Sequence, residues 1–163
     1  MLNYKTASKN EKQFLSLTGM TVSVFNVLHK SYRKEWGGYI KVYTVSGEKR
    51  MRPHRKRPDG VLEETEDQLM FILHYIKSNG IQEHHAAVYG MHQSQCNAWI
   101  HLLLRLLKQT LTKLGEMPER DAKKIKSVLS GVQGIYIDGT ERDIQRPLDE
   151  EKQRKYYSGK KNS

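Results

Sequence analysis

The amino-acid sequence predicts a mainly α-helical fold followed by one short β-strand. Three stretches carry apolar residues at the three- and four-residue spacing of a helix with one buried face, and they cover 21–36, 65–78 and 93–114. Glycine, asparagine and proline residues interrupt the chain between them. The strand is expected at 135–137, where three β-prone residues precede Asp138-Gly139.

The chain is small and basic. Its 163 residues include 28 Lys and Arg against 18 Asp and Glu, for a net charge of +10. Such an excess points to an anionic partner, of which nucleic acid is the commonest. Cys96 is the single cysteine, which excludes an internal disulfide and fits a reducing cytosol. With no apolar run long enough to span a bilayer and no signal-peptide core, we expect a soluble cytoplasmic protein without a membrane partner.

Two helices are predicted near the N-terminus, at 10–17 and 21–36. Asn10 and Thr21 suit the N-cap positions of these helices, because their side chains can accept bonds from the first turn. Gly37-Gly38 is expected to end the second helix.

A short hairpin and a basic segment are expected next. Residues 40–45 alternate in the manner of a strand before a turn at Ser46-Gly47. A run of cations, interrupted by Pro53 and Pro58, then comprises Lys49, Arg50, Arg52, Arg55, Lys56 and Arg57. This run is too polar to pack, so it is either a solvated linker or an arm that follows DNA phosphates or enters a minor groove.

The helix at 65–78 has sequence signals at both ends. Thr65 and Gln68 have the spacing of a capping box, and Asn79-Gly80 closes the helix. Its expected buried stripe consists of Leu69, Ile72, Leu73 and Ile76.

Residues 82–107 have the pattern of a helix-turn-helix. Two helices are hinged at Tyr89-Gly90-Met91, with Ala86 four residues before the glycine and with Cys96 and Trp99 expected to face inward. A small residue lets two helices cross closely, and glycine allows the tight turn between them. The leucine-rich second half is expected to pack on the N-terminal helices or on a second subunit. The spacing alone also fits two packed helices with no role in DNA binding.

Polar residues of the second helix are the candidate DNA-reading residues. They are Gln93, Ser94, Gln95, Asn97 and His101, and glutamine or asparagine can form two bonds with adenine. Candidate phosphate contacts are Lys77, Arg105 and Lys108. The alternative is an ordinary solvated helix face. A zinc site is not expected, because the spacing of His84, His85, His92 and Cys96 fits no common structural zinc pattern.

A more specific motif begins at the predicted strand. It consists of Ile137-Asp138-Gly139-Thr140-Glu141-Arg142, Ile144-Gln145-Arg146-Pro147, Lys152-Gln153 and Tyr156-Tyr157-Ser158-Gly159-Lys160-Lys161. These residues closely resemble the start of the catalytic domain of DDE-superfamily transposases encoded by bacterial insertion sequences. The stretches 14–19, 73–77 and 82–101 are similar to the helix-turn-helix region that precedes that domain.

The resemblance implies an RNase H-like fold whose carboxylates hold two Mg²⁺ ions for cleavage and joining of DNA strands. Asp138 matches the first of these carboxylates, as a catalytic and metal-binding residue of a complete domain. The match stops at Ser163 without the other carboxylates, so we expect this chain alone to hold no cofactor and to cut no DNA. Asp143 departs from the family, which usually has proline there. The adjacent lysines Lys160-Lys161 suggest the upstream frame of a frameshifted transposase or the remnant of a decayed element.

We therefore expect five regions along the chain. They are an N-terminal helical segment at 1–45, a basic arm at 46–62, the helix-turn-helix at 63–116, a linker with a charged segment at 117–133, and an incomplete catalytic domain at 134–163.

The resulting hypothesis is the DNA-binding N-terminal part of an insertion-sequence transposase. It would recognise the element's terminal repeats in double-stranded DNA and lie at the bacterial nucleoid. A second copy of the chain or a full-length transposase fits as protein partner. The alternative is a stand-alone helix-turn-helix regulator or an inhibitor of transposition.

Overall fold

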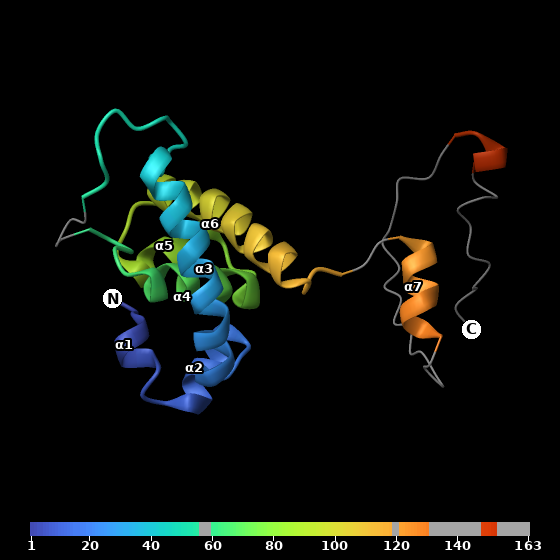
Figure 1. Ribbon diagram of the computed structural model, residues 1–163, viewed down its shortest axis with the longest axis horizontal. Coiled ribbons are helices and arrows are strands. Elements are labelled where there is room, and N and C mark those ends of the chain that lie inside the picture. The colour runs from blue at the N-terminus through green and yellow to red at the C-terminus, as the bar shows by residue number, and fades with distance from the viewer. Residues whose placement is uncertain (56–59, 119–120, 131–147, 153–163) are drawn as a thin grey trace. The chain divides into compact units, whose positions relative to one another are not determined.

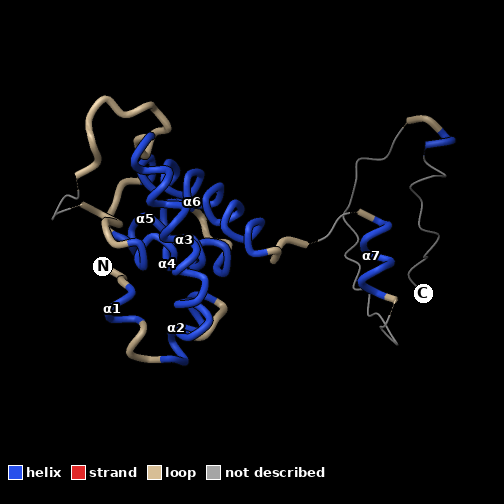
Figure 2. Tube along the Cα trace, in the orientation of Figure 1, coloured by secondary structure: helices blue, strands red, loops and turns tan. Residues whose placement is uncertain are grey.

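The computed structural model describes residues 1–55, 60–118, 121–130 and 148–152 (Figure 1). Its helices are α1 (Tyr4–Ala7), α2 (Glu11–Thr18), α3 (Val22–Val42), α4 (Thr65–Ser78), α5 (Gln82–Tyr89), α6 (Gln93–Leu114) and α7 (Ala122–Leu129). No strand is formed within these ranges, and the prediction of a mainly helical protein is confirmed for them (Figure 2). The strand predicted at 135–137 lies outside the described residues.

The chain divides into two units, Met1–Pro118 and Glu119–Ser163. The first unit contains α1 to α6 around one hydrophobic core. The second contains α7, which lies within the segment that the sequence indicated as a linker, and whose Ile125 and Leu129 are half-buried. Within the described ranges, no helix has the length and apolar character needed to cross a membrane.

The predicted N-caps of α2 and α3 are confirmed. The Asn10 side chain accepts a hydrogen bond from the Gln13 backbone N–H (3.1 Å), and Thr21 Oγ1 accepts one from the Val24 N–H (3.4 Å). Each cap satisfies a backbone donor that the first helical turn leaves without an internal partner. These two residues therefore determine where α2 and α3 begin.

Helix α3 does not end at Gly37-Gly38, as the sequence predicted, but continues to Val42. Tyr32, Trp36 and Ile40 recur every four residues, and all three are buried. A glycine inside a helix costs about 1 kcal/mol relative to alanine, whereas burial of a large apolar side chain contributes about 1.5–3 kcal/mol. Burial of Trp36 and Ile40 therefore outweighs the two glycines, and the residues predicted to start a strand are helical.

The predicted hairpin is reduced to a tight turn at Ser46-Gly47. Tyr43 and Lys49 form a single antiparallel bridge on either side of this turn, and Gly47 has a left-handed backbone with φ of +88°. The Thr44 N–H donates to the Glu48 carbonyl (2.8 Å). The turn prediction is confirmed, but the strands before and after it are absent from the described residues because α3 takes up residues 40–42.

Helix α4 is the centre of the first unit, and it contacts α1, α2, α3 and α6. Leu69, Met70, Phe71 and Ile72 have no exposed surface, so burial surrounds the first half of the helix instead of following one stripe. Ile76, which was predicted to be buried, is 51% exposed. The neighbouring helices therefore enclose the beginning of α4 more completely than its end.

Thr65 and Gln68 do not form the predicted capping box. Thr65 Oγ1 bonds with His29 Nε2 (2.8 Å), and the Gln68 side chain donates to the Leu62 carbonyl (2.8 Å) and accepts from the Tyr32 hydroxyl (3.2 Å). Gln68 is only 1% exposed, so its amide needs partners inside the protein. These bonds attach the beginning of α4 to α3 in place of a cap.

The N-terminal residues reach the helices of the predicted helix-turn-helix. The Leu2 N–H donates to the Val88 carbonyl in α5 (3.2 Å), and the Tyr4 N–H donates to the Asp67 carboxylate in α4 (2.6 Å). The Tyr4 ring also stacks on Phe25 of α3, with centroids 5.0 Å apart. The segment predicted at 1–45 thus shares one core with α4 to α6.

Candidate nucleic-acid interface

Helices α4, α5 and α6 have the arrangement of a helix-turn-helix, with the turn where the sequence predicted it. Helix α5 ends at Gly90, which has φ of +65°, and the next N–H, that of Met91, donates to the Ala86 carbonyl (3.0 Å). Ala86 is 2% exposed, as expected for the small residue of a close helix crossing. Cys96 and Trp99 are buried, as predicted.

Replacing Gly90 by alanine is expected to lower the free energy of unfolding by about 1–2 kcal/mol, because an L-residue is strained in the left-handed region. Urea unfolding followed by circular dichroism measures this loss. Gly37→Ala is the matched control: an added Cβ meets no atom within 4 Å in the interior of α3. That substitution should stabilise the protein by about 0.5–1 kcal/mol. Equal effects of the two substitutions would contradict the strained turn.

An aromatic cluster attaches α5 to α4. The Phe71 ring lies 4.4 Å from the His85 ring and 4.8 Å from the Tyr89 ring, between centroids. His85 Nε2–H donates to the Phe71 carbonyl (3.2 Å), and the Tyr89 hydroxyl bonds with His74 Nδ1 (3.3 Å). The polar atoms of these rings are therefore used within the cluster, which fixes how α5 lies on α4.

Burial controls the charge of this cluster. It lowers the pKa of His85 to about 4; the nearby His74 also lowers it, and the bond to Phe71 opposes both effects. Burial likewise lowers the pKa of His74 and raises the pKa of Tyr89. Both histidines are therefore neutral at neutral pH, so this cluster packs the helices and presents no cation to DNA.

Helix α6 has an exposed polar beginning and one buried face that continues along the helix. Four of the predicted DNA-reading residues, Gln93, Ser94, Gln95 and His101, are exposed, and Asn97 is half-buried. Further along, Leu102, Leu103, Leu106 and Leu107 are buried, and α6 contacts α3 and α4. The leucine-rich half thus packs on an N-terminal helix, which was one of the two predicted partners.

Gln82 connects the beginnings of α5 and α6, a role that the sequence did not indicate. Its side-chain oxygen Oε1 accepts a hydrogen bond from Gln93 Nε2 (2.9 Å), and its side-chain nitrogen Nε2 donates one to Asn97 Oδ1 (3.1 Å). These bonds hold the Gln93 and Asn97 side chains in place, and each side chain keeps a second polar atom for a further bond. Gln82 lies 11 residues before Gln93 and 15 residues before Asn97, in a different helix from both. Spacing within one helix therefore could not predict these bonds.

The predicted phosphate-contact residues lie in several elements. Lys77 is exposed in the last turn of α4, and Lys108 is exposed on α6. The Arg105 guanidinium lies over the Tyr39 ring, 5.1 Å from its centroid. Within the predicted basic arm, Arg52 and Arg55 are exposed and Arg50 is half-buried, whereas Lys56 and Arg57 lie outside the described residues.

Metal binding was predicted only for a complete catalytic domain, at Asp138, which also lies outside the described residues. Across 1–55, 60–118, 121–130 and 148–152, no three His, Cys, Asp or Glu side chains gather in a way that could hold a metal ion. Burial raises the pKa of Cys96, so its thiol is protonated at neutral pH. The four residues considered for zinc include two exposed ones, His84 and His92.

The geometry of α4, α5 and α6 defines a helix-turn-helix. Residues 61–113, from the loop before α4 almost to the end of α6, match the family model described as the helix-turn-helix of DDE superfamily endonuclease. This part of the chain is therefore similar to the helix-turn-helix region of the DDE superfamily, in agreement with the predicted resemblance to transposases. Comparisons with curated proteins and with solved structures gave no significant match.

Proposed function

We propose that this protein binds double-stranded DNA as the N-terminal part of an insertion-sequence transposase and recognises the terminal repeats of its element. The observation that carries the proposal is the exposed polar beginning of α6 within a helix-turn-helix of the DDE superfamily. In proteins with this motif, the N-terminal residues of the second helix contact base edges in the major groove. The net charge of +10 adds an attraction that does not depend on sequence.

The side chains at the beginning of α6 have different tasks in this proposal. Ser94, Gln95 and His101 are exposed and meet base edges or nearby phosphates directly. Gln93 and Asn97 are held by Gln82 before DNA arrives, so they lose little side-chain freedom on binding. This preorganisation supports sequence-specific reading by the first turns of α6.

Contacts to the DNA backbone come from outside these first turns. Lys77 at the end of α4 and Lys108 on α6 are exposed cations on two of the three helices. Phosphate contacts of this kind fix the position of the protein on the duplex but carry no sequence information. The basic arm, described up to Arg55, adds further cations.

The proposed activity is recognition of DNA. The two-metal chemistry that the resemblance implies needs carboxylates besides Asp138 to place Mg²⁺ ions against the attacking and leaving oxygens, and it is not part of this proposal. The proposed role is therefore to recognise DNA, either as two copies or together with a full-length transposase.

Footprinting on DNA that carries both ends of the element and the neighbouring promoters tests the proposal. Protection at the terminal repeats is the expected result. Protection confined to the promoters would contradict it and would favour a stand-alone regulator. The mass of the protein–DNA complex, with and without full-length transposase, then distinguishes one copy, two copies and a mixed complex.

Replacing Gln95 and His101 together by alanine is expected to reduce the preference for the footprinted site over mixed-sequence DNA by about tenfold or more, because a good base contact is worth about 1–3 kcal/mol. Affinity for mixed-sequence DNA should change little. Competition binding with the two duplexes measures the preference. Gln109→Ala, an exposed substitution in the second half of α6, is the matched control. Equal loss of preference in the control would contradict reading by the first turns.

A further inference from the structure

The continuation of α3 beyond Gly37-Gly38 brings two tyrosines into contact with each other and one of them, Tyr39, into contact with α6. The rings of Tyr39 and Tyr43 are stacked, with centroids 5.4 Å apart and an interplanar angle of 29°. The Arg105 guanidinium of α6 lies 5.1 Å from the Tyr39 ring centroid, in cation–π geometry. Tyr39 therefore connects the end of α3 to the helix that carries the candidate reading residues.

The end of α3 also holds the beginning of the basic arm, through one tyrosine hydroxyl and two backbone carbonyls. The Tyr39 hydroxyl donates to the Thr44 carbonyl (3.0 Å). The Arg50 backbone N–H donates to the Val42 carbonyl (2.8 Å), and Arg50 Nε donates to the Tyr43 carbonyl (2.9 Å). The first residues of the arm are thus attached to the end of α3, and Arg105 is attached to the same place.

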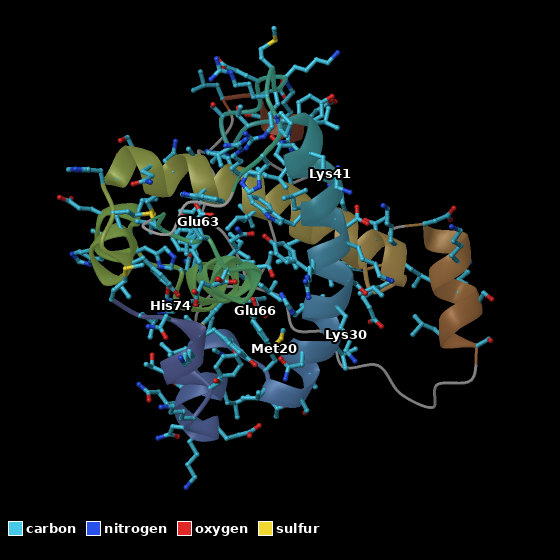
Figure 3. All side chains as sticks on the ribbon, turned by 60° about the vertical axis from the view of Figure 1, so that its left-hand side comes forward. Met20, Lys30, Lys41, Glu63, Glu66 and His74 are labelled. Atoms are coloured by element: carbon cyan, nitrogen blue, oxygen red, sulfur yellow. The ribbon has the colours of Figure 1, made fainter. Side chains whose placement is uncertain are left out.

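Cations are present on the three segments that meet at this tyrosine pair, namely the end of α3, the arm and α6. We name the set the phosphate track, and its members are Lys41, Lys49, Arg50, Arg52, Arg105 and Lys108. Figure 3 shows Lys41 near the C-terminal end of α3, with Lys30 much nearer to the beginning of this helix. Lys41, the member of the track on α3, therefore lies at the end of this helix that leads into the arm.

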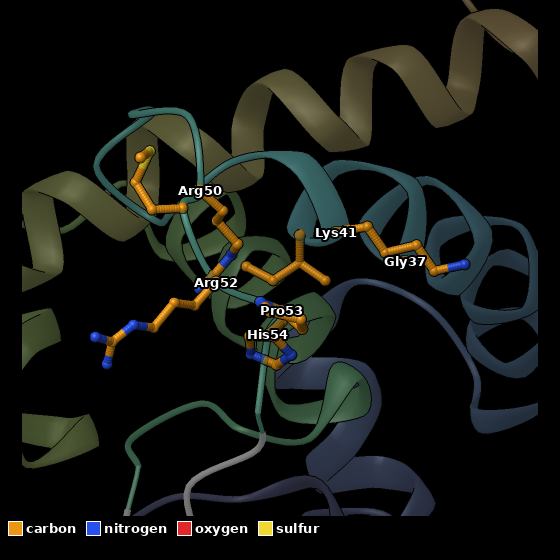
Figure 4. Close-up of a pocket in the computed structure, with 8 residues that line it drawn as sticks. Gly37, Lys41, Arg50, Arg52, Pro53 and His54 are labelled. Atoms are coloured by element: carbon orange, nitrogen blue, oxygen red, sulfur yellow. The ribbon is translucent and has the colours of Figure 1, made fainter.

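The shape of the track decides what it can bind. Lys41, Arg50, Arg52 and His54 line an open cavity of about 520 Å³ whose other walls are mainly Ile40, Met51 and Pro53. Figure 4 shows the Lys41 and Arg52 side chains directed to opposite sides of this cavity. Cations that diverge in this way cannot converge on one small anion. They suit an extended polyanion with charges spaced along its length, as in the backbone of duplex DNA.

We propose that Tyr39 is a positioning residue, which joins the basic arm to α6 so that the phosphate track follows the backbone of the duplex that α6 reads. This inference rests on the proposed function, because it takes the duplex on α6 as given. Tyr39 itself touches no phosphate. Its ring holds Arg105 and stacks on the ring of Tyr43, whose backbone carbonyl accepts from Arg50 Nε at the beginning of the arm.

The test measures the affinity of the full chain for a fluorescein-labelled mixed-sequence duplex over a range of salt concentrations. Arg50→Gln with Arg52→Gln is expected to make the slope of log affinity against log salt shallower by about 2, since each lost phosphate contact changes the slope by about 0.9. Lys30→Gln, an exposed substitution on the same helix, should leave the slope unchanged.

Three Tyr39 experiments separate positioning from charge. Tyr39→Leu removes the ring and should make the slope shallower by about 1–2 without removing any charge. Tyr39→Phe keeps the ring contacts with Arg105 and Tyr43 and removes only the hydroxyl bond to Thr44, so it should retain most of the wild-type slope. Added to the Arg50 and Arg52 substitutions, Tyr39→Leu should cause less than its full effect, because the part that passes through the arm is already lost and only the part that passes through Arg105 remains. A thermal melt confirms that each variant is folded.

Several results would overturn the inference. If the wild type binds no duplex at low salt, the proposed function fails together with the phosphate track. If the wild type binds and folded Tyr39→Leu keeps the wild-type slope, or if its effect adds fully to that of the arm substitutions, only the role of Tyr39 fails. Titration with inorganic phosphate provides a further check. Saturable binding that Arg50→Gln abolishes would assign these cations to a small-anion site instead.

Discussion

Replacing Trp99 by alanine is expected to lower the free energy of unfolding by about 3–5 kcal/mol, the usual cost of removing a buried tryptophan. Trp99 of α6 is 7% exposed, and its ring lies 5.8 Å from that of Trp36 in α3, between centroids. The substitution removes packing between the helix-turn-helix and the N-terminal helices. Urea unfolding at neutral pH, followed by far-ultraviolet circular dichroism, measures the loss.

Two further variants show whether the loss comes from this contact. Leu104→Ala, at a position of α6 that is 38% exposed, should change stability by no more than about 1 kcal/mol. Trp36→Ala should destabilise strongly, and the double substitution should cost less than the sum of the single ones, because both remove the same contact. Full additivity would mean that the two tryptophans stabilise α3 and α6 independently.

Acidification is expected to destabilise the helix-turn-helix through His85. Its pKa is lowered to about 4 in the folded protein from an ordinary value of 6.5, so the unfolded chain binds the proton more readily. Stability from this group is complete above pH 6.5 and is lost as the pH falls toward 4. The full shift corresponds to about 3 kcal/mol, and screening by nearby water reduces the expected loss to about 2 kcal/mol.

Other groups titrate in or near the same range, so the measurement needs a variant that removes His85 alone. Burial lowers the pKa of His74 and of His29, which adds to the acid loss. Burial raises the pKa of Asp67, which acts in the opposite direction, because a carboxyl of raised pKa favours the folded state on protonation. His85→Phe keeps a ring beside Phe71 and should flatten the stability profile between pH 6.5 and 4. An unchanged profile would assign the acid loss to the other groups.

Local sequence signals predicted the helix-turn-helix well, because the residues that shape it are close together in the chain. Ala86, Gly90 and Cys96 lie within eleven positions, and their burial and turn geometry follow from helical spacing. The end of α3 could not be predicted in this way. Gly37-Gly38 is a strong local signal for a helix end, and it is outweighed by Trp36, whose partner Trp99 is distant in sequence.

The same distinction applies to the candidate interface, where some features follow from local spacing and others from the packing of separate helices. Exposure of Ser94 and His101 follows from burial of the opposite face of α6, so helical period is sufficient to predict it. The bonds of Gln82 and the contact between Tyr39 and Arg105 depend on how separate helices pack, and no spacing rule contains that information. The sequence therefore predicts which side chains can face DNA, whereas packing determines which of them are held in place.

The single helix α6 combines both tasks on different faces. Its 22 residues extend over about 33 Å, and its buried side chains, from Cys96 to Thr110, lie on one face, whereas Ser94, Gln95 and His101 are exposed. Substitutions at Ser94, Gln95 or His101 consequently cost little folding free energy. Under the proposed function, related elements can therefore diverge in the DNA sequence that they recognise by exchanging these exposed side chains, while the buried face continues to specify the same fold.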